Sequence, residues 1–186
     1  MNIGFALTGS FCTFSKVFPV MESLAKKYTL IPILSPAAGG IDSRFGKAED
    51  HIQRIVEICG REPLTDIKQV EPIGPKNLLD ALIIAPCTGN TLAKLANSIA
   101  DTSVTMAAKS HLRNGGPVLV AVSTNDALAG AAENIGKLLG RKHYFFVPFG
   151  QDDPEKKPTS MVAEFNKIPE ALKLALDGKQ LQPIIL

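Results

Sequence analysis

The chain has almost no excess of charge of either sign. It carries 20 Lys and Arg against 18 Asp and Glu among 186 residues, a formal net charge of +2. That excess is too small to indicate a nucleic-acid partner, and no basic cluster is interleaved with aromatic residues as a base-stacking surface needs. No apolar run approaches the roughly 20 residues that cross a bilayer. The start, MNIGFALTGS, lacks the charged region and cleavage site of a signal peptide, so we expect a cytoplasmic protein with no membrane partner.

Cysteine is also scarce. Cys12, Cys59 and Cys87 are an odd number of thiols at wide spacings. They indicate reduced thiols and exclude a disulfide framework or a zinc site. No pair of histidines, cysteines or carboxylates has the spacing of metal ligands, so no metal site is predicted.

Glycine motifs that bind nucleotides are missing. A dinucleotide fingerprint needs Gly-x-Gly-x-x-Gly, with an acidic residue about 20 positions further on. The first predicted turn offers only Gly4 and Gly9, and Ser35-Pro36 stands where the acid would follow the second strand. No Gly-x-x-x-x-Gly-Lys-Ser/Thr run is present either. The first absence disfavours a Rossmann-type nicotinamide site, and the second means that the chain has no P-loop.

What the chain does have is an alternation of strand-like and helix-like segments. Its 45% hydrophobic and 20% charged residues are typical of a globular protein, and residues 1–186 suffice for one domain with a sizeable core. Strands are predicted at residues 2–8, 28–34, 79–85, 117–123 and 144–148, and helices at 11–27, 48–59, 92–99, 103–114, 126–139 and 162–176. This order predicts an α/β fold, a three-layer Rossmann-like parallel sheet with helices on both faces.

The segments between these elements carry weaker patterns. We predict a glycine-rich loop at 37–44, a short strand at 67–70, a polar loop at 151–160, and an apolar tail at 181–186 that packs on another element. Pro19 falls within the first helix, where it either kinks the helix or marks its start.

The segment from Leu79 to Ser103 is the most informative one. Its near-continuous apolar run predicts a parallel strand covered on both faces, and Pro86 is expected to end that strand. Small polar residues follow, and apolar residues resume at helical spacing from Leu92. A ligand in this turn would meet backbone N–H groups at a helix N-terminus, which favours an anion such as phosphate.

Small polar residues also cluster at the ends of other predicted strands. Ligands of open parallel sheets bind beyond the carboxyl ends of the strands, near the point where strand order reverses. The clusters are Thr8-Gly9-Ser10, Ser35-Pro36-Ala37, Cys87-Thr88-Gly89-Asn90-Thr91 and Ser123-Thr124-Asn125. Any one of them could be an ordinary turn, but four in equivalent positions predict a ligand crevice.

Two stretches resemble a known family. The run APCTGNTLAKLANSIADT, residues 85–102, and the opening IGFALTGSFCTFSKV are similar to the flavoprotein family of homo-oligomeric flavin-containing cysteine decarboxylases, with Ser98 where glycine is usual. The resemblance implies that the crevice holds FMN, or phosphate in the same place. The cofactor-binding residues that it implies, together with the strand-end clusters, are Gly9, Ser10, Ser35, Thr88, Asn90, Thr91, Ser123 and Asn125. Asn90 could equally cap the helix that begins there.

Three residues are candidates for catalysis, and each has a structural alternative. His51 could match the histidine that the decarboxylases use, but a surface histidine on a helix is the favoured interpretation. Cys87 could be reactive if the helix N-terminus stabilises its thiolate, or it could be a small buried packing thiol. Arg44 could anchor a substrate carboxylate through two parallel donors, or it could be a solvated loop arginine.

The sequence departs from the decarboxylases at two places. Their Pro-x-Met-Asn segment corresponds here to Val122-Ser123-Thr124-Asn125, and the loop at 151–160 has no cysteine for a reactive lid. Decarboxylation of a cysteine is therefore not expected from this chain.

Within this family, the whole chain is most similar to the B subunit of a two-subunit oxidoreductase of spore-forming bacteria. The resemblance implies a small dicarboxylate substrate, oxidation of a dihydropyridine dicarboxylate, and a partner A subunit that carries NAD(P). It also implies self-assembly into a homo-oligomer built on trimers. Two alternatives stay open: a flavin-dependent decarboxylase of the same fold, and a non-catalytic scaffold subunit.

Overall fold

Apolar runs form the central strands of one sheet. The computed structural model describes residues 1–186. The strands are β1 (Asn2–Leu7), β2 (Thr29–Leu34), β3 (Ala81–Cys87), β4 (Val118–Thr124), β5 (Tyr144–Phe146), β6 (Phe149–Gln151) and β7 (Met161–Ala163). All of β3 and all but the last residue of β4 are buried, as expected for parallel strands covered on both faces.

The strand order places a reversal between β1 and β3. The order is β2-β1-β3-β4-β7-β6, and β5 also pairs with β4. Strands β1 to β5 pair parallel with one another. The chain steps from β1 outward to β2 and then returns past β1 to β3. A ligand crevice is therefore expected beyond the carboxyl ends of β1 and β3, where the direction of the connections reverses.

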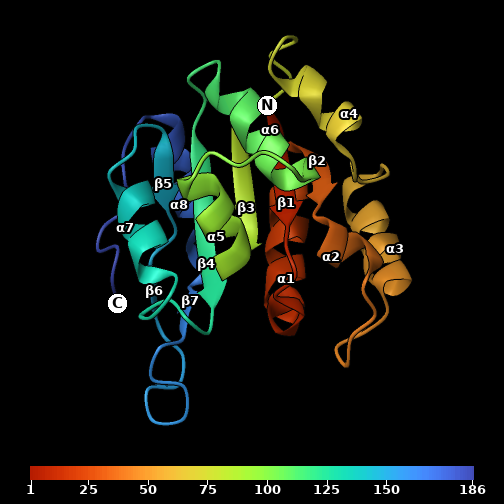
Figure 1. The fold of residues 1–186 in the computed structure, drawn as a ribbon. Coiled ribbons are helices and arrows are strands. Elements are labelled where there is room, and N and C mark those ends of the chain that lie inside the picture. The colour runs from red at the N-terminus through yellow and green to blue at the C-terminus, as the bar shows by residue number, and fades with distance from the viewer.

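Helices cover both faces of the sheet. They are α1 (Phe14–Ala25), α2 (Pro36–Gly40), α3 (Ala48–Cys59), α4 (Ile67–Val70), α5 (Gly89–Ala96), α6 (Ser103–Leu112), α7 (Ala132–Leu139) and α8 (Ile168–Leu176), with single turns at Phe11–Thr13, Glu71–Ile73 and Phe165–Lys167. Helices α5, α6 and α7 pack on one face, α1 and α8 on the other, and α2 and α3 at the β2 edge (Figure 1). The predicted three-layer α/β fold is confirmed.

One cluster of 48 buried residues runs through these layers. A single domain over residues 1–186 stays a prediction. No helix has both the length and the apolar character that a membrane span requires.

The prediction of a wholly parallel sheet is wrong at one edge. β7 pairs antiparallel with the end of β4 through Ser123 and Thr124, and β6 pairs antiparallel with β7. The predicted helix at 162–176 therefore begins only at Ile168. Strands of three residues are too short to show an alternating pattern, so no local signal indicates this hairpin.

Other predictions near the edges of the fold are also corrected. Ile67–Val70 is a helical turn, because Asp66 and Gln69 form a capping box around it. The predicted glycine-rich loop begins as the short helix α2, and the helix predicted at 126–139 begins only at Ala132. Turns fill the gap before it, held to the hairpin by a hydrogen bond from Leu128 N to the Thr159 carbonyl at 3.0 Å.

The prolines act differently from expectation. Pro86 does not end β3, because it lies where the register with β4 shifts and its missing N–H therefore breaks no regular ladder. Pro19 lies inside α1, which begins before it at Phe14. The apolar tail does pack: Phe149 N donates to the Ile184 carbonyl and Leu186 N donates to the Phe149 carbonyl, at 2.9 and 3.1 Å.

A buried histidine packs against a glycine where α6 turns into β4. His111 is 1% exposed, and its Nε2 lies 3.2 Å from the carbonyl oxygen of Pro117. Burial lowers the pKa of His111, which keeps the imidazole neutral and structural. A Cβ at Gly116 would overlap the ring, so this turn requires glycine.

We predict opposite effects for two glycine-to-alanine substitutions. Gly116→Ala should lower the free energy of unfolding by about 1–3 kcal/mol, because the added methyl overpacks His111. Gly136→Ala, in α7 with open space around it, should raise it by up to about 1 kcal/mol. Urea unfolding at a fixed protein concentration measures both, and changes of the same sign would contradict the packing at His111.

Candidate functional site

The carboxyl end of β1 is tied to the loop that follows β3. The hydroxyl of Thr8 donates to the carbonyl oxygen of Pro86 at 2.7 Å and accepts from the backbone N of Thr88 at 3.0 Å. Thr8 is 1% exposed, so both bonds are shielded from water. The turn after β1 and the start of α5 therefore hold a fixed position relative to each other.

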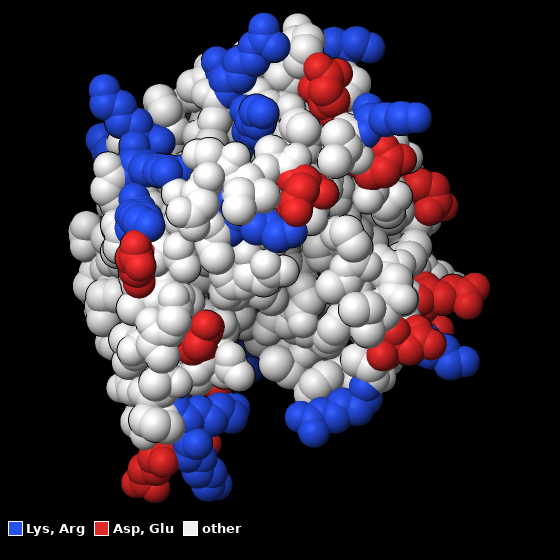
Figure 2. All heavy atoms as spheres, in the orientation of Figure 1, with Lys and Arg blue, Asp and Glu red and all other residues white.

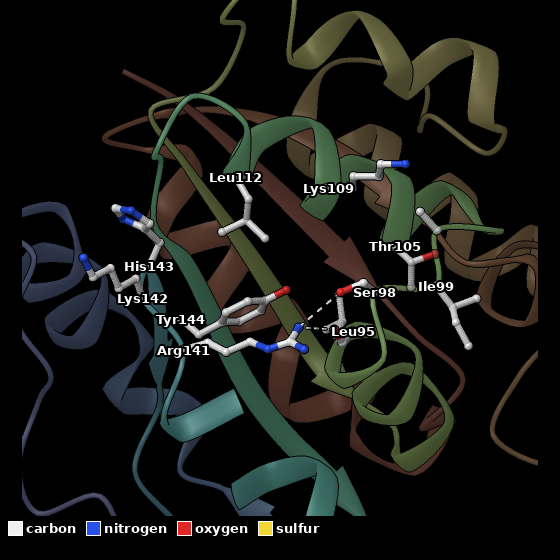
Figure 3. A pocket seen from close by; sticks show the side chains of 11 residues that line it. Leu95, Ser98, Ile99, Thr105, Lys109, Leu112, Arg141, Lys142, His143 and Tyr144 are labelled. Atoms are coloured by element: carbon white, nitrogen blue, oxygen red, sulfur yellow. Dashed lines mark hydrogen bonds between the residues drawn. The ribbon is translucent and has the colours of Figure 1, made fainter. Parts of the chain in front are cut away.

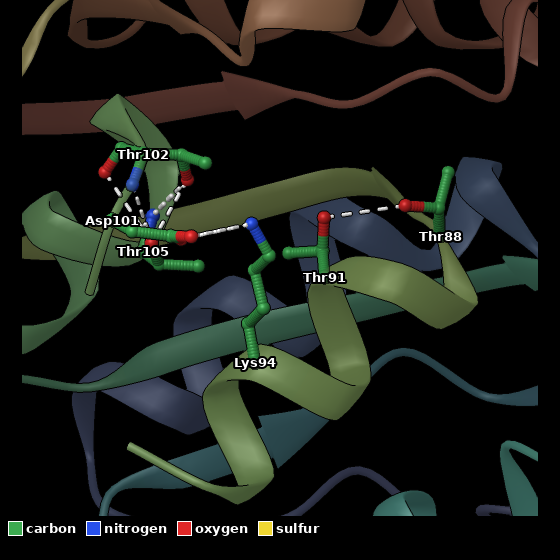
Figure 4. A network of polar contacts seen from close by, with 6 residues as sticks. All are labelled: Thr88, Thr91, Lys94, Asp101, Thr102 and Thr105. Atoms are coloured by element: carbon green, nitrogen blue, oxygen red, sulfur yellow. Dashed lines mark hydrogen bonds and ion pairs between the residues drawn. The ribbon is translucent and has the colours of Figure 1, made fainter. Parts of the chain in front are cut away.

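A row of hydroxyls continues from Thr8 into α5. The Oγ1 atoms of Thr8 and Thr88 are 3.4 Å apart, and those of Thr88 and Thr91 are 3.2 Å apart. One turn further along, Lys94 pairs with Asp101 at 2.8 and 2.9 Å (Figure 4). The hydrogen bond from Lys94 lowers the pKa of Asp101. This ion pair joins α5 to the segment before α6.

A second pair of hydroxyls spans the sheet. Ser10, in the turn after β1, lies 2.7 Å from Ser123, at the end of β4, measured between their Oγ atoms. Gly89 lets α5 begin close to this strand end, because a Cβ there would lie 2.7 Å from Asp126 Oδ1 and 2.8 Å from Thr124 Oγ1. The ends of β1, β3 and β4 thus converge on one place.

These strand ends line a crevice of about 620 Å³. Its size is within the range of cofactor and small-molecule sites. The lining residues are Gly9, Ser10, Phe11, Cys12, Phe45, Thr88, Ser123, Thr124, Asn125, Asp152, Lys157, Ser160 and Val162. The structure therefore brings together five of the predicted cofactor residues: Gly9, Ser10, Thr88, Ser123 and Asn125.

Three predicted cofactor residues do not line the crevice. The hydroxyl of Ser35 accepts from the backbone N of Ala38 at 3.2 Å and caps α2. Thr91 is buried behind Thr88. Asn90 is exposed on the first turn of α5, and the N-cap of that helix is Thr88, so the capping role considered for Asn90 is wrong.

Sequence reasoning missed the hairpin's contribution to the site. Lys157, in the loop between β6 and β7, lies 3.3 Å from Asp152, measured from Nζ to Oδ2, and both side chains line the crevice. Lys157 is the one Lys or Arg among the lining residues. Only the antiparallel pairing of β7 with β4 carries this loop to the strand ends, so no local signal could have found it.

His51 is buried, and the prediction of a surface histidine is wrong. Its ring packs edge-on against Phe14 with centroids 5.0 Å apart, and lies 5.9 Å from the ring of Phe18. Its Nε2 has no hydrogen-bond partner. Gly46 also packs closely on the ring, because a Cβ there would lie 2.8 Å from it.

The pocket around His51 adjoins the crevice. It has a volume of about 210 Å³, and Phe11, Cys12 and Phe45 line both spaces. The imidazole therefore lies at the far side of an aromatic wall of the crevice.

The other two catalytic candidates lie outside the crevice. Cys87 is fully buried, and burial raises the pKa of its thiol, which favours the packing interpretation. Arg44 is exposed, with its guanidinium carbon 4.8 Å from the centroid of the Phe45 ring. It does not line the crevice, so the structure gives no support to a role as carboxylate anchor.

Comparison with known proteins agrees with this arrangement. The Flavoprotein family matches residues 1–166. The B subunit of dipicolinate synthase from Bacillus subtilis (strain 168) is 44% identical over 186 residues, covering 100% of this chain and 93% of that protein. The crystal structure of the same subunit of dipicolinate synthase from Bacillus halodurans C has a TM-score of 0.91 and 42% identity, covering 100% of this chain and 95% of that one.

A more distant structure has the same fold. DmrB from Burkholderia xenovorans in complex with FMN, described as a cubic protein cage for redox transfer, has a TM-score of 0.69 and 18% identity, covering 95% of each chain. From the family match and the full-length relatives, this chain belongs to the Flavoprotein family.

Proposed function

We propose that this chain is the B subunit of a dipicolinate synthase and contributes to the oxidation of a dihydrodipicolinate-type intermediate to dipicolinate during sporulation. The observation that carries the proposal is the full-length similarity to the B subunits of two dipicolinate synthases. The reaction removes a hydride and a proton from the ring, so it needs a hydride acceptor. The missing dinucleotide fingerprint in this chain supports a partner A subunit that holds NAD(P).

We further propose that the crevice holds FMN. The donors present fit the group: Ser10, Thr88 and Ser123 offer hydroxyls to a phosphate, and Phe11 and Phe45 offer apolar ring faces beside them. Gly9 lines the crevice without a side chain to occupy it, and a Cβ there would lie 3.2 Å from Ala37 Cβ. Bound flavin would supply electron transfer, while this chain's residues bind and orient the cofactor.

Lys157 is our candidate for the residue that binds a substrate carboxylate. It is the cation of the crevice, and in the structure Asp152 is its partner. A dicarboxylate that enters the crevice can take the place of Asp152 at the Lys157 ammonium. This assigns to Lys157 the anchoring role that the sequence suggested for Arg44.

The proposed function leads to two predictions, of which the first concerns cofactor binding. Ser10→Ala and Ser123→Ala should each weaken FMN binding by about tenfold or more, because each removes a crevice hydroxyl that the proposal assigns to the phosphate. Absorbance of the flavin on titration of the purified protein measures the affinity. Ser23→Ala, on the exposed face of α1, is the matched control and should bind FMN as the parent chain does.

Two results would count against the FMN site. One is parent-like affinity in both serine variants. The other is a protein that stays colourless after incubation with FMN, which would favour the scaffold alternative.

The second prediction concerns substrate binding in the complex reconstituted with the A subunit. Lys157→Met should raise KM for the dicarboxylate substrate by about tenfold or more, because a charge-assisted hydrogen bond is lost, while FMN affinity stays unchanged. Lys156→Met is the control, since Lys156 is exposed and does not line the crevice. Equal KM values for the two variants would exclude Lys157 as the anchor.

A further inference from the structure

A second cavity lies at the other end of the sheet. It has a volume of about 430 Å³ and shares no lining residue with the crevice. Its walls come from the end of α5, from α6, and from the segment that leads into β5 (Figure 3). The crevice lies beyond the carboxyl ends of the strands, whereas this cavity lies toward the amino ends of β4 and β5.

The cavity contains a hydroxyl with no partner in the protein. Tyr144, the first residue of β5, is 9% exposed, and none of the hydrogen bonds of the structure involves its hydroxyl, which points into the cavity (Figure 3). Burial raises the pKa of Tyr144 to about 12, so the hydroxyl stays protonated at neutral pH and can donate. The hydroxyl is open to the cavity, so water or a ligand there can accept its hydrogen bond.

Positive charge surrounds the cavity. Lys109, Arg141 and Lys142 line it, together with His143, and no Asp or Glu does. Lys109 and Lys142 form no ion pair, whereas Arg141 donates to the carbonyl oxygens of Leu95 and Ala96 at the end of α5, at 3.0 and 2.6 Å. On this side of the molecule Lys and Arg side chains gather at the upper left, where β5 begins (Figure 2).

The rest of the wall is a mixture of apolar side chains with the hydroxyl residues Ser98 and Thr105. Leu95 is buried, Leu112 is partly buried, and Ile99 is exposed at 47%. A wall with apolar side chains, an unpartnered tyrosine hydroxyl and a cationic rim suits a ligand with a flat apolar body and an acidic group. Inorganic phosphate alone would leave the apolar wall uncovered.

We propose that this cavity is a second binding site, separate from the crevice, for a small aromatic carboxylate. The Tyr144 hydroxyl donates to the carboxylate, Lys109 and Lys142 balance its charge, and the ring of the ligand packs on Leu95 and Leu112. Arg141 holds the end of α5 in place and so shapes the wall.

The test is calorimetric titration of the purified full chain with isophthalate, with neutral isophthalamide and inorganic phosphate as comparison ligands. Isophthalate should bind more tightly than either. Tyr144→Phe, which removes only the hydroxyl, should weaken isophthalate binding by about tenfold or more. Lys109→Met with Lys142→Met should also weaken it, and both residues are exposed, so the fold is retained.

The crevice variant Ser123→Ala separates the two sites and should leave isophthalate binding unchanged. Loss of binding in that variant but not in Tyr144→Phe would overturn the proposal, because the ligand would then occupy the crevice. No heat of binding up to the solubility limit of isophthalate would overturn it as well. So would equal affinity for isophthalate and phosphate, which would mean a simple anion site.

Discussion

The hydrogen bonds of Thr8 fix the geometry on which the crevice depends. In a sheet whose strand order reverses between β1 and β3, the two strand ends would otherwise be free to diverge. The Thr8 hydroxyl bonds to both Pro86 and Thr88, so the loop after β3 is held beside the end of β1. Ser10 then reaches Ser123 across the end of β3, and α5 starts with its first N–H groups beside them. A hydroxyl that both donates and accepts is needed at position 8, which an apolar side chain cannot replace.

The second constraint is that β4 has two different neighbours on the same side. Its first half pairs with β5, and its end, Ser123 and Thr124, pairs with β7. Because β7 pairs with the part of β4 that β5 leaves unpaired, the β6–β7 hairpin extends beyond the parallel sheet and forms one wall of the crevice. Lys157 and Asp152 reach the site through this hairpin, which adds charge to a crevice otherwise lined by hydroxyls and aromatic rings. At the opposite end of β4, Tyr144 at the start of β5 pairs with Val118 and lines the second cavity.

Much of the fold could be predicted from the sequence, and the errors have a common cause. The apolar run that became β3 and the helix α3 at Ala48–Cys59 have patterns long enough to recognise. β6 and β7 do not, because a strand of three residues shows no periodicity. Ile67–Val70 looks like a short strand by composition, yet the capping box between the flanking Asp66 and its own Gln69 makes it a helix. Local pattern therefore failed where a flanking residue or a distant strand decided the conformation.

For the site, the sequence by itself determined which strand ends carry small polar residues and that no dinucleotide fingerprint exists, since both are local properties of the chain. Only the tertiary structure decided which of those ends meet. Ser10 and Ser123 are 113 residues apart in the chain and become partners through strand order alone. Ser35, from an equally promising cluster, instead caps its own helix. Likewise His51 looks exposed on an amphipathic helix, but packing against Phe14 buries it, because burial is a property of the assembled layers.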